Sequence, residues 1–362
     1  MNYAARQKKL AERLQEAGVE ALLITHLPRI QYLCGFTGSS GVLVLQAGPR
    51  APRLVFYTDG RYTQQAREEV HGPRIVIAKK AALAEACAWV VKAGIKTLGF
   101  EGDSLSYAVH QQLAKALRGA VKLKPAGGII ETLRATKDAD EIGQIRASAL
   151  LAASLFQTAL AAIRPGVAES LVAGELELQA RRAGAEKMSF DTIVAAGPRS
   201  ALPHGRASSQ AIPSRGFIIL DYGVILAGYC SDMTRTVHVG RATPAHRRMY
   251  EAVRSAQLAS IEAVRPGVEA GAVDRAGRDL LKKAGYGSYF THSTGHGVGI
   301  EVHEQPRLAK GQTQALQPGM VVTIEPGIYM PGEGGVRIED MVLVTESGHE
   351  VLTPTTKDLI EL

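Results

Sequence analysis

The stretch that decides the fold reads Phe217-Ile-Ile-Leu-Asp221-Tyr-Gly-Val-Ile-Leu-Ala-Gly-Tyr-Cys-Ser-Asp232. An apolar run followed by a glycine-containing reversal predicts a β-hairpin, and this one holds two carboxylates eleven positions apart. If the loop centres between Leu226 and Ala227, the two aspartates face each other with Cβ atoms about 5 Å apart. Like charges so placed are destabilising, so either the turn is offset and one aspartate meets solvent, or a cation compensates the pair.

A second hairpin carries two more acids inside apolar strands. Its strands are Met320-Val-Val-Thr-Ile-Glu325 and Val336-Arg-Ile-Glu339, and the turn-rich segment Pro331-Gly-Glu-Gly-Gly335 joins them. A carboxylate that interrupts a core strand is costly unless it is paired or binds a metal. The sequence therefore predicts four acids on two core hairpins.

An internal repeat relates the two hairpins. Ala162-Ile-Arg-Pro-Gly-Val167 recurs as Ala263-Val-Arg-Pro-Gly-Val268, each between two helical stretches and each ahead of one of the acidic hairpins. Two copies of a helix, helix and hairpin unit predict a pseudo-symmetric domain in which the hairpins meet in one curved sheet.

Histidines are concentrated in the segment 290–306, where His292, His296 and His303 occur within twelve positions. Glycines at 295, 297 and 299 flank His296 and let the backbone approach a ligand closely or bend sharply. The glycines alone would also suit a phosphate-binding loop, but their spacing matches neither common pattern. One imidazole with four carboxylates forms a hard, oxygen-rich set that can hold two divalent cations and favours manganese, cobalt or zinc over copper. The chemistry that such a site supports is hydrolysis.

The rest of the chain divides into two expected domains, 1–127 and 128–362. The first is an α/β domain with strands at 21–24, 41–45, 53–57, 74–77 and 96–100 and helices at 4–18, 60–70, 81–93 and 104–118. Residues 125–128 contain one proline and two glycines and are the expected linker. A long helix is expected to begin near Lys137 and run to about Ile163.

Composition excludes several classes of function. The net charge is +7, but lysine and arginine occur as scattered pairs without a long basic block, so no nucleic-acid partner is expected. No run of eighteen or more apolar residues offers a membrane span. The N-terminus lacks the pattern of a signal peptide, and three widely spaced cysteines fit a reducing compartment, so a cytoplasmic location is expected.

Taken together, these motifs resemble the pita-bread metallopeptidases, and the resemblance covers essentially the whole chain. It rests on the hairpin of Asp221 and Asp232 and on four further motifs in the family's order, Thr294-Gly-His-Gly-Val-Gly299, His303-Glu-Gln-Pro306, Ile324-Glu-Pro-Gly327 and Val336-Arg-Ile-Glu-Asp340. Tyr32-Leu-Cys-Gly-Phe-Thr-Gly38 and Tyr57-Thr-Asp-Gly-Arg-Tyr62 match the first domain of the same family more weakly. The implied α/β (α+β) fold is a creatinase-like N-terminal domain, followed by a pseudo-symmetric pita-bread domain whose curved antiparallel sheet is covered by helices.

The resemblance also implies a role for particular residues. Two divalent metal ions, manganese with cobalt or zinc as alternatives, would be held by Asp221, Asp232, His296, Glu325 and Glu339, with Asp232 and Glu339 bridging. A metal-bridging hydroxide would attack the substrate carbonyl, with Glu325 as a proton shuttle. His204 and His303 would donate hydrogen bonds to the substrate. The expected substrate-binding residues are His204, His292, His303, Tyr329 and Arg337; Tyr329 suits a structural role equally, and Arg337 would orient Asp221.

The implied activity is that of an Xaa-Pro aminopeptidase, which removes an N-terminal residue ahead of proline from short peptides. An Xaa-Pro dipeptidase (prolidase) shares every one of these motifs and is the nearest alternative, since the sequence does not show how the space beyond proline is closed. A non-catalytic peptide-binding protein on the same scaffold and a nucleic-acid binder are the competing hypotheses from other classes. The resemblance further implies a homodimer formed through the N-terminal domain.

Overall fold

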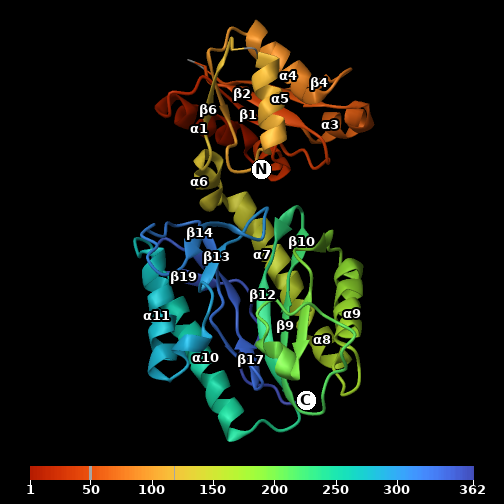
Figure 1. Ribbon diagram of the computed structural model, residues 1–362, viewed down its shortest axis with the longest axis vertical. Coiled ribbons are helices and arrows are strands. Elements are labelled where there is room, and N and C mark those ends of the chain that lie inside the picture. Colours follow the sequence, from red (N-terminus) through yellow and green to blue (C-terminus); the bar gives the residue numbers. More distant parts are fainter. Residues whose placement is uncertain (49–50, 118) are drawn as a thin grey trace. The chain divides into compact units, whose positions relative to one another are not determined.

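The computed structural model describes residues 1–48, 51–117 and 119–362. Contacts divide the chain into two compact units, an N-terminal unit, Met1–Arg134, and a C-terminal unit, Ala135–Leu362 (Figure 1). The boundary predicted between residues 127 and 128 lies before helix α6 (Ile129–Ala135), whereas this division falls near the end of that helix.

The N-terminal unit is built on one mixed sheet of six strands in the order β4-β3-β2-β1-β5-β6. One face of this sheet packs on α4 and α5 through residues such as Val44, Val90 and Leu113. The strands are β1 (Ala21–Ile24), β2 (Val42–Gln46), β3 (Arg53–Thr58), β4 (Arg74–Ile77), β5 (Thr97–Phe100) and β6 (Lys122–Pro125). The helices ahead of α6 are α1 (Tyr3–Glu16), α2 (Leu27–Cys34), α3 (Thr63–Glu69), α4 (Ala82–Lys92) and α5 (Tyr107–Leu117), with a 3-10 turn at Gly60–Tyr62.

Two elements of this unit escape the sequence prediction. Strand β6 pairs in parallel with β5 and includes Pro125, which the sequence assigns to a linker. Because β6 lies at the sheet edge and is largely exposed, it lacks the apolar alternation of a strand. Helix α2 has the signals of a short helix, with Pro28 in its first turn and Gly35 in a left-handed C-cap. The last residue of the helix expected at 104–118 lies outside the described residues.

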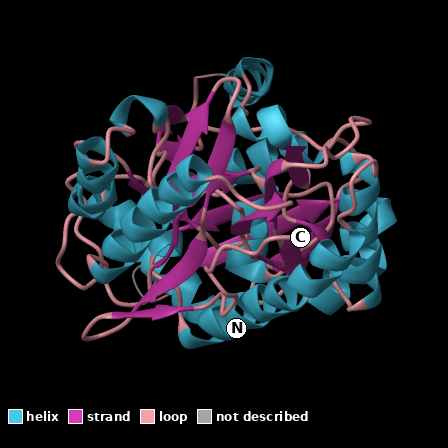
Figure 2. Ribbon diagram, turned by 90° about the horizontal axis from the view of Figure 1, so that it is seen from below, coloured by secondary structure: helices cyan, strands magenta, loops and turns pink. Residues whose placement is uncertain are grey.

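The C-terminal unit consists of antiparallel strands with helices around them (Figure 2). Its helices are α7 (Ala139–Ser154), α8 (Phe156–Ala162), α9 (Glu169–Arg182), α10 (Pro244–Glu262) and α11 (Ala270–Lys283). The strands of its first half are β7 (Lys187–Met188), β8 (Ile193–Ala196), β9 (Gly216–Tyr222), β10 (Val224–Leu226), β11 (Tyr229–Cys230) and β12 (Met233–Val239). Those of its second half are β13 (Gly295–Gly297), β14 (Glu304–Leu308), β15 (Val321–Ile324), β16 (Gly327–Met330), β17 (Gly334–Arg337), β18 (Asp340–Val344) and β19 (His349–Val351).

The two halves repeat the same local structure, as the internal repeat predicts. The first Pro-Gly turn joins α8 to α9 and the second joins α10 to α11. In each turn the glycine has a positive φ, 86° at Gly166 and 82° at Gly267. The amide of Gly166 donates to Ile212, and the amide of Gly267 donates to Leu316 at the corresponding place.

The two acidic hairpins meet along β12 and the strand that contains β17 and β18. The amide of Glu339 donates to the carbonyl of Thr234 at 3.1 Å, and the Thr236 hydroxyl bonds both the amide and the carbonyl of Arg337. β9, β12, β17 and β18 are therefore continuous in space. This arrangement confirms the predicted α/β fold with a curved antiparallel sheet in its second domain.

The register of the first hairpin differs from the prediction. Its turn is Ala227-Gly228, because Leu226 pairs with Tyr229, and both turn residues have a positive φ, 49° and 76°. A two-residue turn of this kind requires glycine or a residue that tolerates the left-handed region. The expectation that Asp221 lies directly opposite Asp232 is therefore wrong, and Asp221 pairs with Thr234 instead. Since side chains alternate along a strand, both aspartates still project from the same side, as diagonal neighbours about 7–8 Å apart.

The single helix expected from Lys137 to Ile163 is two helices that Leu155 separates. Asp138 begins α7 with a capping box that includes Glu141. The stretch Ala139–Ala162 is long and apolar enough to cross a membrane by length and composition alone. Its residues Ala152, Leu155, Phe156 and Ala159 are buried in the core of the C-terminal unit against α9 and β9.

Replacing Gly223 by alanine tests this register. A Cβ atom there would lie 1.8 Å from the carbonyl oxygen of Ser231, which is backbone and cannot move aside without opening the hairpin. We expect Gly223→Ala to lower the free energy of unfolding by about 1–3 kcal/mol, measured by urea denaturation. Gly143→Ala is the matched control, because Gly143 is exposed within α7 with open space around it and alanine should stabilise that helix by about 0.5–1 kcal/mol. Equal unfolding midpoints for Gly223→Ala and the wild type would contradict this register.

Candidate metal centre

Five of the predicted site residues lie where strands of the C-terminal unit end or break. Asp221 is near the end of β9, Asp232 precedes β12, and His296 is the central residue of β13. Glu325 follows β15, and Glu339 lies between β17 and β18. Asp221, Asp232 and Glu339 are buried, with exposed fractions of 8%, 4% and 2%, so three carboxylates are withdrawn from water.

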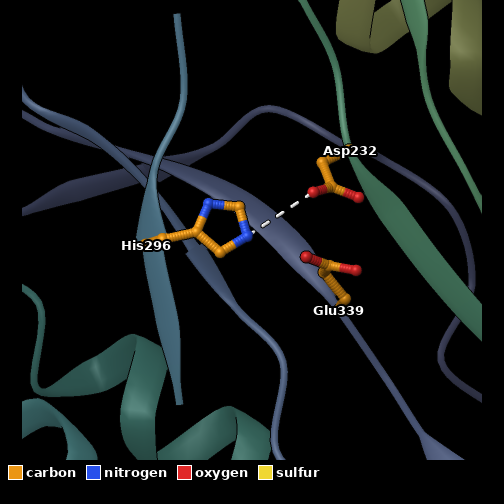
Figure 3. A group of neighbouring side chains, drawn as sticks. All are labelled: Asp232, His296 and Glu339. Atoms are coloured by element: carbon orange, nitrogen blue, oxygen red, sulfur yellow. Dashed lines mark ion pairs between the residues drawn. The ribbon is translucent and has the colours of Figure 1, made fainter. Parts of the chain in front are cut away.

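Three of these side chains point toward one another from strands far apart in the sequence (Figure 3). One donor atom from each of Asp232, His296 and Glu339 lies within 4.8 Å of the other two. The Nε2 atom of His296 is 3.7 Å from Oδ2 of Asp232 and 3.5 Å from Oε1 of Glu325. These separations exceed hydrogen-bond length and leave room for an ion between nitrogen and oxygen.

The backbone of β13 presents His296 to the acids because its glycines let it lie close to its neighbours. A Cβ atom at Gly295 would be 1.9 Å from the carbonyl oxygen of Thr323, and one at Gly297 would be 2.1 Å from that of Gln305. The Nδ1 atom of His296 bonds the carbonyl of Gly297 at 3.0 Å, so Nδ1 carries the proton and Nε2 keeps a free lone pair. Burial, and after it the neighbouring His303, lowers the pKa of His296 to about 4, which keeps the ring neutral.

The carboxylates repel one another strongly. Burial raises the pKa of Asp232 well above its usual range, and Glu339, Asp221 and Glu325 raise it further. Burial and then Glu339 raise the pKa of Glu325 in the same way. The pKa of Glu339 rises to about 8 through burial and the charge of Asp221. Only partial compensation comes from the cation of Arg337, which lowers the pKa of all three.

These residues fit divalent metal ions. Within the part of the chain that the structure describes, Oδ1 of Asp221 is buried without a hydrogen-bond partner, although its other oxygen is 2.6 Å from Arg337. An orphaned carboxylate oxygen beside three mutually repelling acids and a neutral imidazole is a set of oxygen and nitrogen donors that lacks positive charge. Cations would supply that charge, and all five donors belong to types that manganese, cobalt and zinc accept.

Arg337 and Thr234 orient the acids from behind. Arg337 donates to Asp221 through Nη2 and to the Thr234 hydroxyl through Nε at 3.1 Å. The Thr234 hydroxyl then donates to Oε2 of Glu339 at 2.7 Å. Thr234 is absent from the predicted site. Its only signal in the sequence is its place two positions after Asp232, on the same side of β12, and other strand threonines share such spacing.

His292 and Tyr329 form a directional chain of hydrogen bonds to Arg337. The Nδ1 atom of His292 bonds the carbonyl of Ser293 at 2.8 Å, so Nδ1 carries the proton and Nε2 accepts from the Tyr329 hydroxyl at 2.8 Å. Tyr329 accepts in turn from Nη1 of Arg337 at 2.6 Å. Burial lowers the pKa of His292 to about 4, with Arg337 next in effect, and burial raises the pKa of Tyr329 to about 12. The chain places both residues beside the acids.

His204 and His303 lie at the exposed side of this cluster. The ring of His303 packs edge-on against that of His296, with centroids 4.4 Å apart. Burial and then His204 lower the pKa of His303, and His204 also lowers the pKa of His292. Nη1 of Arg337 donates to the carbonyl of Pro203, the residue before His204, at 3.1 Å. Both His204 and His303 have exposed side chains, and their rings can reach a bound molecule from solvent.

Two family descriptions match this chain. Residues 143–346 match "Metallopeptidase family M24", and residues 6–136 match "Creatinase/Prolidase N-terminal domain". The first match includes every residue of the cluster described above, and a family described as metallopeptidases implies divalent metal ions at such a site.

Similar proteins span the whole chain. The Xaa-Pro dipeptidase of Pyrococcus horikoshii is 37% identical over 353 residues, which are 98% of this chain and 98% of that protein. The solved structure of an Xaa-Pro dipeptidase from Bacillus anthracis is 41% identical, covers all of both chains and has a TM-score of 0.95. The structure of an X-Pro aminopeptidase from Thermotoga maritima is 32% identical, covers 97% of this chain and 100% of that one, and has a TM-score of 0.87.

The repulsion within the cluster predicts an unusual dependence of stability on pH in the metal-free protein. Because the pKa of Glu339 rises from 4.5 to about 8 on folding, its contribution to stability is complete below pH 4.5 and is lost as the pH rises through about 8. After treatment with a chelator, we expect the melting temperature to fall between about pH 6 and pH 8. Saturating Mn²⁺ should reverse this trend, because the cations replace the protons.

The control is Glu339→Gln, which removes one of the three acids with a raised pKa and should lessen the decline in the metal-free protein. Melting temperatures measured by circular dichroism at both pH values, with and without Mn²⁺, provide the comparison. A metal-free melting temperature that rises over this interval would contradict the electrostatics described here.

Proposed function

Since this chain belongs to metallopeptidase family M24, we propose that it is a metal-dependent Xaa-Pro dipeptidase, which hydrolyses the bond between an N-terminal residue and a C-terminal proline. The observation that carries the proposal is similarity over the full length to proteins named Xaa-Pro dipeptidase, at 37% and 41% identity. The sequence favours an Xaa-Pro aminopeptidase. That activity is the second candidate, supported by the likeness to the Thermotoga enzyme.

The proposed metal ligands are those expected from the sequence, Asp221, Asp232, His296, Glu325 and Glu339. Two divalent cations, manganese with cobalt or zinc as alternatives, would match the charge of four carboxylates that have one arginine beside them. Asp232 and Glu339 are proposed as shared ligands, because their oxygens lie close both to each other and to His296. When bound, the cations would polarise the substrate carbonyl and lower the pKa of a water molecule.

The chain's own side chains supply the remaining chemistry. His204 and His303 are proposed to donate hydrogen bonds to the substrate carbonyl and to the oxyanion that develops from it, an effect worth about 3 kcal/mol for each donor. Glu325, whose burial favours a bound proton, is proposed to take the proton of the attacking water and to deliver it to the leaving amine. His292 and Tyr329 would line the side where the proline ring lies.

A dipeptidase must also bind the carboxylate of its C-terminal proline, and Arg307 is placed to do so. In the pairing of β13 with β14, Arg307 lies directly opposite His296. Residues in such a pair project from the same face of the sheet, with Cβ atoms about 5 Å apart. The Arg307 side chain is exposed and so remains free to meet a ligand. We propose that its guanidinium group binds the substrate carboxylate through paired hydrogen bonds.

Two further parts of the proposal concern the protein's surroundings. Cys34, Cys87 and Cys230 are all free and buried, in keeping with a reducing, cytoplasmic location. A homodimer formed through the N-terminal unit is proposed from the family resemblance, with short peptides that contain proline as substrates.

Substrate length is the decisive test. With the Mn²⁺-loaded protein we expect hydrolysis of Xaa-Pro dipeptides and little hydrolysis of Xaa-Pro-Xaa peptides or of Xaa-Pro amides, which lack the free carboxylate on proline. Arg307→Met should raise KM for the dipeptide roughly tenfold to a hundredfold, because hydrogen bonds to a charged group are worth about 1.5–3 kcal/mol. Arg275→Met, at an exposed arginine on α11, is the control and should leave KM unchanged.

Efficient cleavage of Xaa-Pro-Xaa peptides would establish the aminopeptidase instead. A protein that binds Mn²⁺ but cleaves none of these peptides would overturn both candidates and favour a non-catalytic peptide-binding role.

A further inference from the structure

A charged pair on helix α11 lies on the buried face of that helix, apart from the metal centre. Asp274 and Arg278 stand four residues apart, with side-chain exposures of 2% and 27%. The same face buries Val273 and Leu281. A carboxylate on a core face loses its hydration and is retained only where its hydrogen bonds are fully satisfied. Unlike an exposed ion pair, this pair must therefore make further hydrogen bonds that offset the cost of its burial.

The two side chains form a bidentate ion pair and together bind one short segment of backbone. Arg278 donates to both carboxylate oxygens of Asp274, at 2.8 and 2.9 Å. It also donates to the carbonyl of Phe290 at 3.1 Å and to that of His292 at 2.7 Å, and its guanidinium carbon lies 4.0 Å from the centroid of the Phe290 ring. Asp274 accepts from the hydroxyl of Thr294 at 2.8 Å and from its amide at 3.3 Å.

The bound segment, residues 290–294, belongs to no helix or strand, and the pair holds every second residue along it. Thr294 is also held by backbone hydrogen bonds, since its amide donates to the carbonyl of Leu308 at 2.9 Å, whereas Phe290 and His292 take their positions from these side-chain contacts. The planar guanidinium group suits this task, because its donors are fixed in direction and can bind two carbonyls and a carboxylate at once.

This segment connects to the proposed active site at two points. His292 bonds the Tyr329 hydroxyl, the first link of the chain that ends on Arg337 and Asp221. The carbonyl of Thr294 accepts the amide of Glu325 at 2.7 Å. A shift of the segment would therefore move a substrate-side histidine and a proposed metal ligand together.

We infer that Asp274 and Arg278 are positioning residues, which set the place of His292 on the substrate side and of Glu325 on the metal side by clamping residues 290–294. The part that concerns His292 and the substrate rests on the proposed function. The part that concerns Glu325 and the metal rests only on the hydrogen bonds of residues 290–294, so the two parts can be tested separately.

The test compares Arg278→Met, Arg278→Ala, Arg278→Lys and Asp274→Asn with the control Arg275→Met, an arginine-to-methionine change on the exposed side of the same helix. Arg278→Met should lower kcat/KM for the dipeptide roughly tenfold to a hundredfold, as expected when a group that orients a ligand is lost. Arg278→Lys should recover only part of this, because an ammonium group cannot reach both carbonyls and the carboxylate. Millimolar guanidinium should restore activity to Arg278→Ala, whereas the same concentration of sodium chloride should not.

Direct titration of the metal-free proteins with Mn²⁺ supplies a readout that needs no turnover. Asp274→Asn should weaken Mn²⁺ binding roughly tenfold, because it weakens the hydrogen bonds that hold Thr294, whose carbonyl binds the amide of Glu325. If the wild type hydrolyses no Xaa-Pro peptide, the proposed function fails while this measurement still decides the inference.

Arg278→Met that melts at a lower temperature but keeps wild-type kinetic constants and Mn²⁺ affinity would show a purely structural pair and overturn the inference. If Asp274→Asn does not fold, Arg278→Lys carries the same comparison.

Discussion

Mutual repulsion among buried carboxylates is the constraint on which the C-terminal unit depends. Burial alone raises the pKa of Asp232, Glu325 and Glu339. Neighbouring acids raise these pKa values further, because the two hairpins bring the carboxylates together. Arg337 offsets part of this charge, and Oδ1 of Asp221 has no hydrogen-bond partner among the described residues. Cations bound among these acids would relieve the repulsion.

The internal repeat produces the two acidic hairpins, and hydrogen bonds from neighbouring residues fix the positions of their carboxylates. Each half of the unit contributes two helices, a Pro-Gly turn and an acidic hairpin. Behind the acids, Arg337 fixes Asp221, Thr234 fixes Glu339, and the carbonyl of Thr294 fixes the backbone of Glu325. The inferred positioning pair on α11, Asp274 and Arg278, would extend this support one layer further from the proposed metal ligands, so that elements from both hairpins and from a helix hold the geometry.

The sequence predicts the chemical inventory of the site better than its geometry. Acids inside apolar strands and a histidine flanked by glycines can be recognised from the sequence alone. The neighbouring residues in the chain already show that burying such groups costs free energy. The register of the first hairpin is not, since it depends on whether Ala227 adopts a positive φ. Strand β6 is hidden because an exposed edge strand has no apolar alternation. Asp274 and Arg278 look in the sequence like a solvated pair one helical turn apart, and only the tertiary structure shows that their face is buried.

Choosing between dipeptidase and aminopeptidase depends on what lies beyond the proline, whereas either activity would depend on the metal ions. The most direct test is the stoichiometry of bound Mn²⁺ after metal removal, reloading and desalting, measured by mass spectrometry of the metal. Two ions per chain are expected for the wild type and for Asp279→Asn, an exposed control on α11, and one or none for Asp232→Asn. A wild type that retains no metal, or an Asp232→Asn variant that still binds two ions, would contradict the claim that the acids of the two hairpins meet to hold a pair of cations.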